Sequence, residues 1–204
     1  METKAIPVSV YAESTPNPST MKFVTNKLLV ENNATVEYTD SEETQNSPLA
    51  ARLFNFPFVT GIFITANFIT VTKNNLIDWE DVVMEIREYI TEYLKDGKSV
   101  FIGEIHENTQ QEVKHAAIAS EFIPNTDTEK KIVEILEDYV RPAVEQDGGA
   151  IHVKNYNSEA GKLTVILRGS CSGCPSSSVT LKAGIQGLFD RMLPEVKEVV
   201  AEEL

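Results

Sequence analysis

Two cysteines three positions apart give this sequence its most distinctive chemical feature. Cys171 and Cys174 are the only cysteines among 204 residues, and glycine, serine and proline surround them from residue 169 to 177. Two thiolates at this spacing can bind one metal ion, or two atoms of one iron–sulfur cluster, from the same side of a tight loop. Because no export signal precedes them, the pair indicates metal binding or redox chemistry rather than a structural disulfide.

The residues beside the cysteines suit a thiolate site. Gly169 and Gly173 let the backbone bend around a bound atom, and Pro175 fits the first turn of a following helix, where an N–H group would have no partner. The positive end of that helix and the nearby Arg168 should stabilise thiolates or an anionic cluster. The alternative, that the cysteines are merely small buried side chains, is weaker because their neighbours are typical of a loop.

The number of available ligands limits what the pair can hold. Structural zinc and 2Fe-2S or 4Fe-4S clusters ordinarily take four protein ligands, whereas one copy of this chain offers two cysteines. His106, His115 and His152 each stand alone in the sequence, and we interpret them as surface residues, with His152 on the solvent side of a strand. A second copy of the chain supplies two more thiolates if a two-fold axis passes through the loop. We therefore expect a homodimer with an exposed, readily released metal centre.

A helix should precede the site at the start of a C-terminal domain over residues 127–204. An N-cap at Asp127 or Thr128 begins it, and Arg141-Pro142 perturbs its last turn. The Asp147-Gly148-Gly149 segment then either ends the helix as a simple turn or serves partner docking. The apolar residues at helical spacing predict one buried face, formed by Ile132, Ile135, Leu136, Tyr139 and Val140.

The rest of this domain should place the cysteine loop between a strand and a helix. Alternating side chains predict an antiparallel pair of strands at 150–156 and 162–168. After the loop, a helix at 179–192 ends before Pro194, and residues 195–201 form a last strand or a frayed tail. The predicted order is α-β-β-α-β.

An N-terminal domain is predicted over residues 1–102. Alternating segments indicate strands at 8–11 and 21–24 and a hairpin at 59–71, with Gly61 and Ala66-Asn67 as turn residues. A linker at 103–126, with a short helix near 111–119, separates the domains, and the fold class is α+β with two small domains. A helix follows the hairpin, capped by Asp78 and stopped by Gly97, and its buried stripe comprises Trp79, Val83, Ile86, Ile90 and Leu94.

Composition excludes several classes of function. The 18 basic and 31 acidic residues give a net charge of −13, which repels nucleic acid and anionic lipid surfaces. The same charge serves solubility or attracts a basic partner. No apolar stretch approaches the roughly 18 residues that a membrane-spanning helix needs. We expect neither a nucleic-acid partner nor a membrane partner.

Beyond these patterns, the sequence resembles the Nfu type of NifU-like iron–sulfur proteins over most of its length. Residues 128–200 resemble the NifU C-terminal domain in three motifs: Arg141-Pro142, Asp147-Gly148-Gly149, and the segment 169–177 with both cysteines. Residues 11–100 resemble the Nfu N-terminal domain. The matching motifs there are Thr15-Pro16-Asn17-Pro18, Lys22-Phe23, Ser47-Pro48-Leu49-Ala50, the segment 67–73, and Asp78-Trp79.

The resemblance implies a scaffold or carrier rather than an enzyme. Such a protein receives a cluster from upstream assembly proteins and delivers it to apo iron–sulfur proteins. The cluster is usually of the 4Fe-4S kind, with 2Fe-2S as the alternative. Cys171 and Cys174 match the family's ligand positions, and the cluster bridges two protomers. Eukaryotic relatives carry an organelle presequence and this sequence shows none, so a bacterial-type cytoplasmic protein is expected.

Two other functions remain open for the cysteine pair. A thiol-disulfide oxidoreductase also uses CxxC at a strand-to-helix junction, but it requires a parallel βαβ unit, whereas the predicted strands before the loop are antiparallel. A structural zinc site joining two chains would use the same four thiolates. Because the flanking elements already have apolar stripes adequate for a core, we expect the domain to stay folded without metal.

Overall fold

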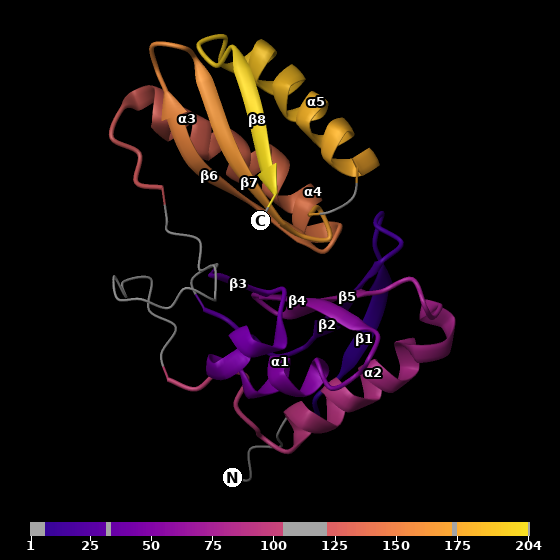
Figure 1. The fold of residues 1–204 in the computed structure, drawn as a ribbon. Helices are drawn as coiled ribbons and strands as arrows, with labels where there is room; N and C mark the ends of the chain where they lie inside the picture. Colours follow the sequence, from indigo (N-terminus) through magenta and orange to yellow (C-terminus); the bar gives the residue numbers. More distant parts are fainter. Residues whose placement is uncertain (1–6, 32–33, 104–121, 173–174, 204) are drawn as a thin grey trace. The chain divides into compact units, whose positions relative to one another are not determined.

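Two compact units make up the described part of the chain, which comprises residues 7–31, 34–103, 122–172 and 175–203 of a computed structural model. The N-terminal unit contains the elements from β1 (Val10–Ser14) to α2 (Trp79–Lys95), and the C-terminal unit those from α3 (Asp127–Ile135) to β8 (Glu198–Glu203) (Figure 1). Each unit has its own sheet, helices and apolar core, which confirms the predicted α+β class. No described helix is both long enough and apolar enough to cross a bilayer.

An antiparallel sheet of five strands forms the N-terminal unit. Its order is β1-β2-β5-β4-β3. The predicted hairpin is confirmed: β4 and β5 pair across a turn at Ala66-Asn67, where Ala66 has a φ of 36°. Gly61 lies at an irregularity of β4, not in the turn. The remaining strand bounds are Thr20–Thr25 for β2, Thr35–Tyr38 for β3, Val59–Thr65 for β4 and Phe68–Lys73 for β5.

Helices cover one face of this sheet. η1 (Ser41–Asn46) and α1 (Pro48–Leu53) follow β3, and α2 follows β5 after the predicted cap residue Asp78. Gly97, with a φ of 68°, comes two residues after the end of α2, as a helix-ending glycine does. The predicted stripe is confirmed at its C-terminal end, and the fully buried residues of α2 are Val82, Ile86, Ile90, Tyr93 and Leu94.

The C-terminal unit has the predicted order α-β-β-α-β. β6 (Gly149–Asn157) and β7 (Lys162–Gly169) are antiparallel, and α5 (Pro175–Met192) connects β7 to β8, which runs parallel to β7. The final segment is therefore a paired strand rather than a frayed tail. Helices pack on one face of the sheet, where the shared core includes Ile132, Val144, Ile151, Val165, Leu167, Ile185, Phe189 and Val199.

The first helix of this unit differs from the predicted one in its start and its interior. Thr126 caps it: its hydroxyl accepts from the Glu129 N–H, and the Glu129 carboxylate accepts from the Thr126 N–H. A π-helical turn, η2 (Leu136–Val140), then separates α3 from α4 (Arg141–Gln146). Tyr139, predicted to be buried, is 58% exposed.

Most of the predicted linker, and the predicted helix at 111–119, lie outside the described residues. His106 and His115 lie there as well. The domain boundaries at 102 and 127 therefore stay a prediction.

Candidate functional site

The cysteine loop lies where the sequence placed it, between β7 and α5. β7 ends at Gly169, whose φ of 64° is in the left-handed region that favours glycine, and α5 begins at Pro175. Cys171 is described, whereas Gly173 and Cys174 lie outside the described residues. The structure thus gives the surroundings of one of the two predicted ligands.

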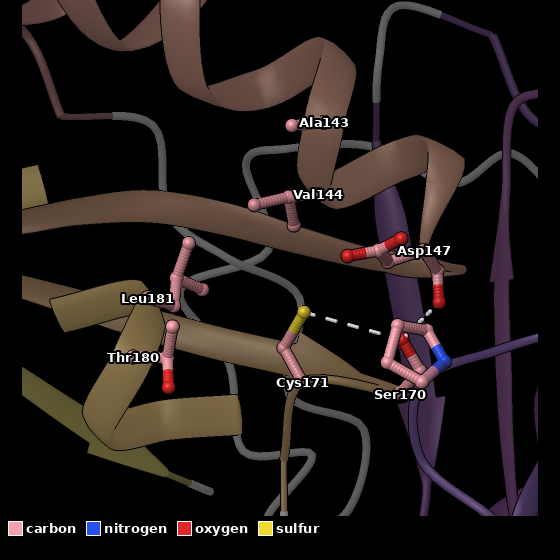
Figure 2. A pocket seen from close by; sticks show the side chains of 8 residues that line it. Ala143, Val144, Asp147, Ser170, Cys171, Thr180 and Leu181 are labelled. Carbon is pink, nitrogen blue, oxygen red and sulfur yellow. Dashed lines mark hydrogen bonds between the residues drawn. The ribbon is translucent and has the colours of Figure 1, made fainter. Parts of the chain in front are cut away.

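Cys171 lies inside the C-terminal unit. Its exposed fraction is 6%, and it belongs to the same apolar core as Val144 and Ile185. Figure 2 shows its Sγ atom directed toward Val144, in a pocket between α4 and the beginning of α5. The lining of this pocket includes Ala143, Val144, Asp147, Ser170, Thr180 and Leu181. The loop-like sequence predicted that the cysteines are not buried side chains, but the structure buries Cys171.

The turn after α4 is hydrogen-bonded to the cysteine loop. The Ser170 hydroxyl donates to the Asp147 carbonyl (Figure 2), and the Ser170 N–H donates to the Gly148 carbonyl at 3.2 Å. Gly148 has a φ of 82°, which explains the glycine. From the sequence, this turn either serves partner docking or simply ends the helix. In the structure, its residue Asp147 also lines the pocket beside Cys171.

Gly149 is a second contact between the turn and the thiol. A Cβ atom at this position would lie 2.7 Å from Cys171 Sγ and 2.7 Å from the Arg168 carbonyl oxygen. Since its φ is not in the left-handed region, space rather than backbone conformation requires glycine here. Sequence reasoning missed this role because it depends on the pairing of Gly149 with Gly169 across β6 and β7.

His152 is partly buried rather than fully exposed, so its interpretation as a solvent-side residue holds only in part. Burial lowers its pKa to about 4, and the positive charges of Arg168 and Arg141 lower it further in the same direction. Arg168 is only 2% exposed, and Arg141 bonds the Glu137 carboxylate at 2.5 Å. Within the described residues, no group of three or more histidine, cysteine or acidic side chains is placed to hold a metal ion. His152 is thus a neutral imidazole beside two guanidinium groups.

The predicted lack of a parallel βαβ unit at the cysteine loop is wrong. β6 and β7 are antiparallel, as predicted, but β7, α5 and β8 form a parallel βαβ unit with Cys171 after its first strand. The sequence missed this pairing because β7 and β8 are distant in the chain. A strand-to-helix CxxC in a parallel unit is also the setting of thiol-disulfide oxidoreductases.

Comparison with known proteins links both units to one family. The model of the scaffold protein Nfu/NifU N-terminal domain matches residues 10–97, and that of the NifU-like domain matches residues 132–200. NifU-like protein 4, mitochondrial, of Arabidopsis thaliana is 33% identical over 193 residues, which are 95% of this chain and 65% of that protein. A NifU-like protein of Schizosaccharomyces pombe is 32% identical over 94% of this chain and 71% of its own length. These matches confirm the resemblance.

The name of a third relative states a function. The NFU1 iron-sulfur cluster scaffold homolog, mitochondrial, of Drosophila sechellia is 32% identical over 190 residues, 93% of this chain and 63% of that protein. This chain spans about two thirds of the length of the three relatives, from 63% to 71%.

The predicted bacterial-type cytoplasmic localisation is contradicted by these relatives. Those from Arabidopsis and Drosophila are named mitochondrial. The prediction rested on the residues at the start of the sequence, and these do not decide the compartment.

Proposed function

We propose that this chain, which belongs to the Nfu family of NifU-like proteins, is a scaffold or carrier that binds an iron–sulfur cluster and transfers it to apo-proteins. The observation that carries the proposal is the CxxC pair in the β7–α5 loop of the NifU-like domain. The name of the Drosophila relative, an iron-sulfur cluster scaffold homolog, supports the same role. The cluster is cargo, so the protein is not an enzyme.

Cys171 and Cys174 from each of two protomers hold the cluster in this proposal. One copy has two cysteines, and a 4Fe-4S cluster, or alternatively a 2Fe-2S cluster, takes four ligands. A two-fold axis through the loop supplies the other two from an identical chain. The bound form is therefore a homodimer whose interface contains the cluster.

Transfer proceeds by ligand exchange. A thiolate of the acceptor forms a bond to a cluster iron while the bond from that iron to Cys171 or Cys174 breaks, and the released thiolate takes a proton from solvent. Neither iron nor sulfur changes oxidation state, so no reductant is needed. Upstream assembly proteins supply the cluster by the same exchange in reverse. The acidic surface and the N-terminal unit select partners.

Anaerobic reconstitution of the full chain with iron and sulfide tests the proposal. We expect visible absorbance from thiolate-to-iron transitions, and native mass spectrometry should give one cluster per two chains. A coloured monomer would overturn the bridged arrangement. Protein that stays colourless and free of sulfide under every loading condition would overturn the function itself.

A second candidate function is thiol-disulfide exchange, which the parallel β7–α5–β8 unit favours. It predicts that metal-free protein cycles reversibly near about −270 mV and reduces insulin, as thioredoxin does. The cluster carrier should do neither. A potentiometric titration together with an insulin assay separates the two functions.

A further inference from the structure

The Cys171 side chain is largely buried, whereas a ligand of a shared cluster must be accessible. Only 6% of the residue is exposed, and its sulfur is directed at Val144 inside the core (Figure 2). A ligand that bridges two protomers must present its sulfur at the protein surface. The position of Cys171 in the structure is thus different from the position that cluster binding requires.

Among the described residues, contacts from the turn after α4 help to keep the sulfur in this position. Gly149 leaves the space that Sγ occupies, because a Cβ atom there would be 2.7 Å away. Ser170 ties the loop to the preceding turn through its hydroxyl, which donates to the Asp147 carbonyl, and through its N–H, which donates to the Gly148 carbonyl. The Ser170 hydroxyl oxygen is also 4.0 Å from Cys171 Sγ. Both contacts come from the turn that ends α4.

Apolar side chains of the core also pack near the sulfur. Val144 of α4 is 1% exposed, and Leu181 of α5 is partly buried against the same core. The pocket beside the sulfur shows that this packing leaves space near the thiol. The side chain can therefore leave its position by a local rearrangement, without opening the whole unit.

We propose that the Asp147–Gly149 turn and Ser170 hold the Cys171 thiol in a sheltered, inward position in the cluster-free protein, and that the thiol turns outward when a cluster is loaded. Gly149 and Ser170 are positioning residues, since they act through Cys171 and touch no cluster. The inward position follows from the structure alone, and only the outward turn on cluster loading rests on the proposed function. Shelter lowers the rate of every reaction that needs the sulfur exposed, including oxidation by solutes.

The alkylation rate of Cys171 by iodoacetamide tests the shelter without any cluster. Cys174→Ala makes Cys171 the only thiol of the full chain. We expect native protein to react at least about tenfold more slowly than the same protein unfolded in urea at the same pH. Adding Ser170→Ala should raise the native rate by about fivefold, the effect of losing one hydrogen bond. Gly149→Ala should raise it further, because the new methyl group occupies the sulfur's space.

Two other glycines provide matched controls for Gly149→Ala. Gly184→Ala adds a methyl group that meets nothing within 4 Å beyond its chain neighbours and its own helix backbone, so the alkylation rate should not change. Gly161→Ala strains the backbone at a φ of +65° at the opposite end of β7, and its Cβ would be 2.7 Å from the Glu195 carbonyl oxygen. It destabilises the unit without touching the thiol, so its effect on the rate should follow global unfolding alone.

The outcomes separate this inference from the proposed function. Alkylation as fast in native protein as in urea, or equal rates with and without Ser170→Ala, would overturn the shelter even if the protein binds a cluster. If Gly149→Ala does not fold, the Ser170→Ala rate decides alone. A sheltered thiol in a protein that never becomes coloured would overturn the function and leave the shelter standing.

Discussion

The two units of this chain differ in the reactive and charged side chains that they bury. Residues 1–105 contain no cysteine and no histidine, and the core of the N-terminal unit is aliphatic and aromatic. Its Lys22 is satisfied locally, by Glu13 at 3.1 Å and by the face of Phe68. The C-terminal unit instead buries the thiol of Cys171 and the guanidinium of Arg168.

This difference indicates where function lies. The N-terminal unit also buries charge, at Lys22 and Lys73, but none of its described residues is a cysteine or a histidine. The C-terminal unit retains groups that are costly to bury, within a smaller sheet. Buried ionisable groups in a cleft are more common at functional sites than elsewhere. Substitutions in one unit should therefore leave the other unit unaffected.

Removal of both thiols should have the largest effect. Cys171→Ala with Cys174→Ala should abolish bound iron and sulfide completely, whereas Lys22→Met in the N-terminal unit should leave both unchanged. Elemental analysis after anaerobic reconstitution measures the loss. Circular dichroism should show the double variant still folded, because the core around Cys171 is mainly hydrocarbon. An unfolded C-terminal unit would instead favour a structural metal site.

A matched pair of core truncations should separate the stabilities of the two units. Ile69→Ala and Ile185→Ala each remove a side chain that is at most 2% exposed, and each should cost about 2–5 kcal/mol in its own unit. Trp79, the only tryptophan, lies in α2 and reports on the N-terminal unit. Its fluorescence in urea should shift for Ile69→Ala and not for Ile185→Ala. A shift of equal size in both variants would show that the units unfold together.

The pH dependence of stability should be steeper for the C-terminal unit. The pKa of His152 is about 4 in the folded chain against 6.5 ordinarily, so the unfolded chain binds more protons between these values. The free energy of unfolding should therefore fall as pH drops from about 6.5 to 4, by about 1–3 kcal/mol. Urea titrations followed by circular dichroism measure this slope, and His152→Gln should flatten it. An unchanged slope in that variant would assign the dependence to other groups.

Substitutions at the two helix N-caps, Thr126 and Asp78, should have the smallest effects on stability. Thr126→Ala removes a reciprocal capping box and should cost about 1 kcal/mol. Asp78 makes no side-chain capping bond to α2, so Asp78→Asn should cost only about 0.3 kcal/mol through the helix dipole. Denaturant midpoints at constant slope compare the two. A cost for Asp78→Asn equal to that of Thr126→Ala would mean that charge at the start of α2 stabilises it as much as the capping box stabilises α3.

Local patterns predicted most of the fold. The stripe of α2, the β4–β5 hairpin and the order of elements in the C-terminal unit all follow from periodicity and turn residues close in sequence. The position of the cysteine loop follows for the same reason. These features depend on neighbours within a few residues, and the sequence displays those neighbours directly.

Features set by distant pairing could not be predicted. The parallel alignment of β8 with β7 depends on the path of α5, and the contact of Gly149 with Cys171 depends on strands that meet only in the folded sheet. The alternating pattern placed His152 in solvent, yet it is partly buried and feels the positive charges of Arg168 and Arg141. Surroundings of this kind require coordinates.

The π-helical turn at Leu136–Val140 determines which way α4 faces. Twelve residues separate Ile132 from Val144, and a regular helix at about 100° per residue would leave them about 120° out of phase. The wider turn, closed by the Arg141 N–H on the Leu136 carbonyl, rotates the chain less per residue and brings both side chains into one core. The π-helical turn, several residues before Val144, thus sets which side of α4 faces Cys171. Deleting one residue from this turn would rotate Val144 away from the thiol.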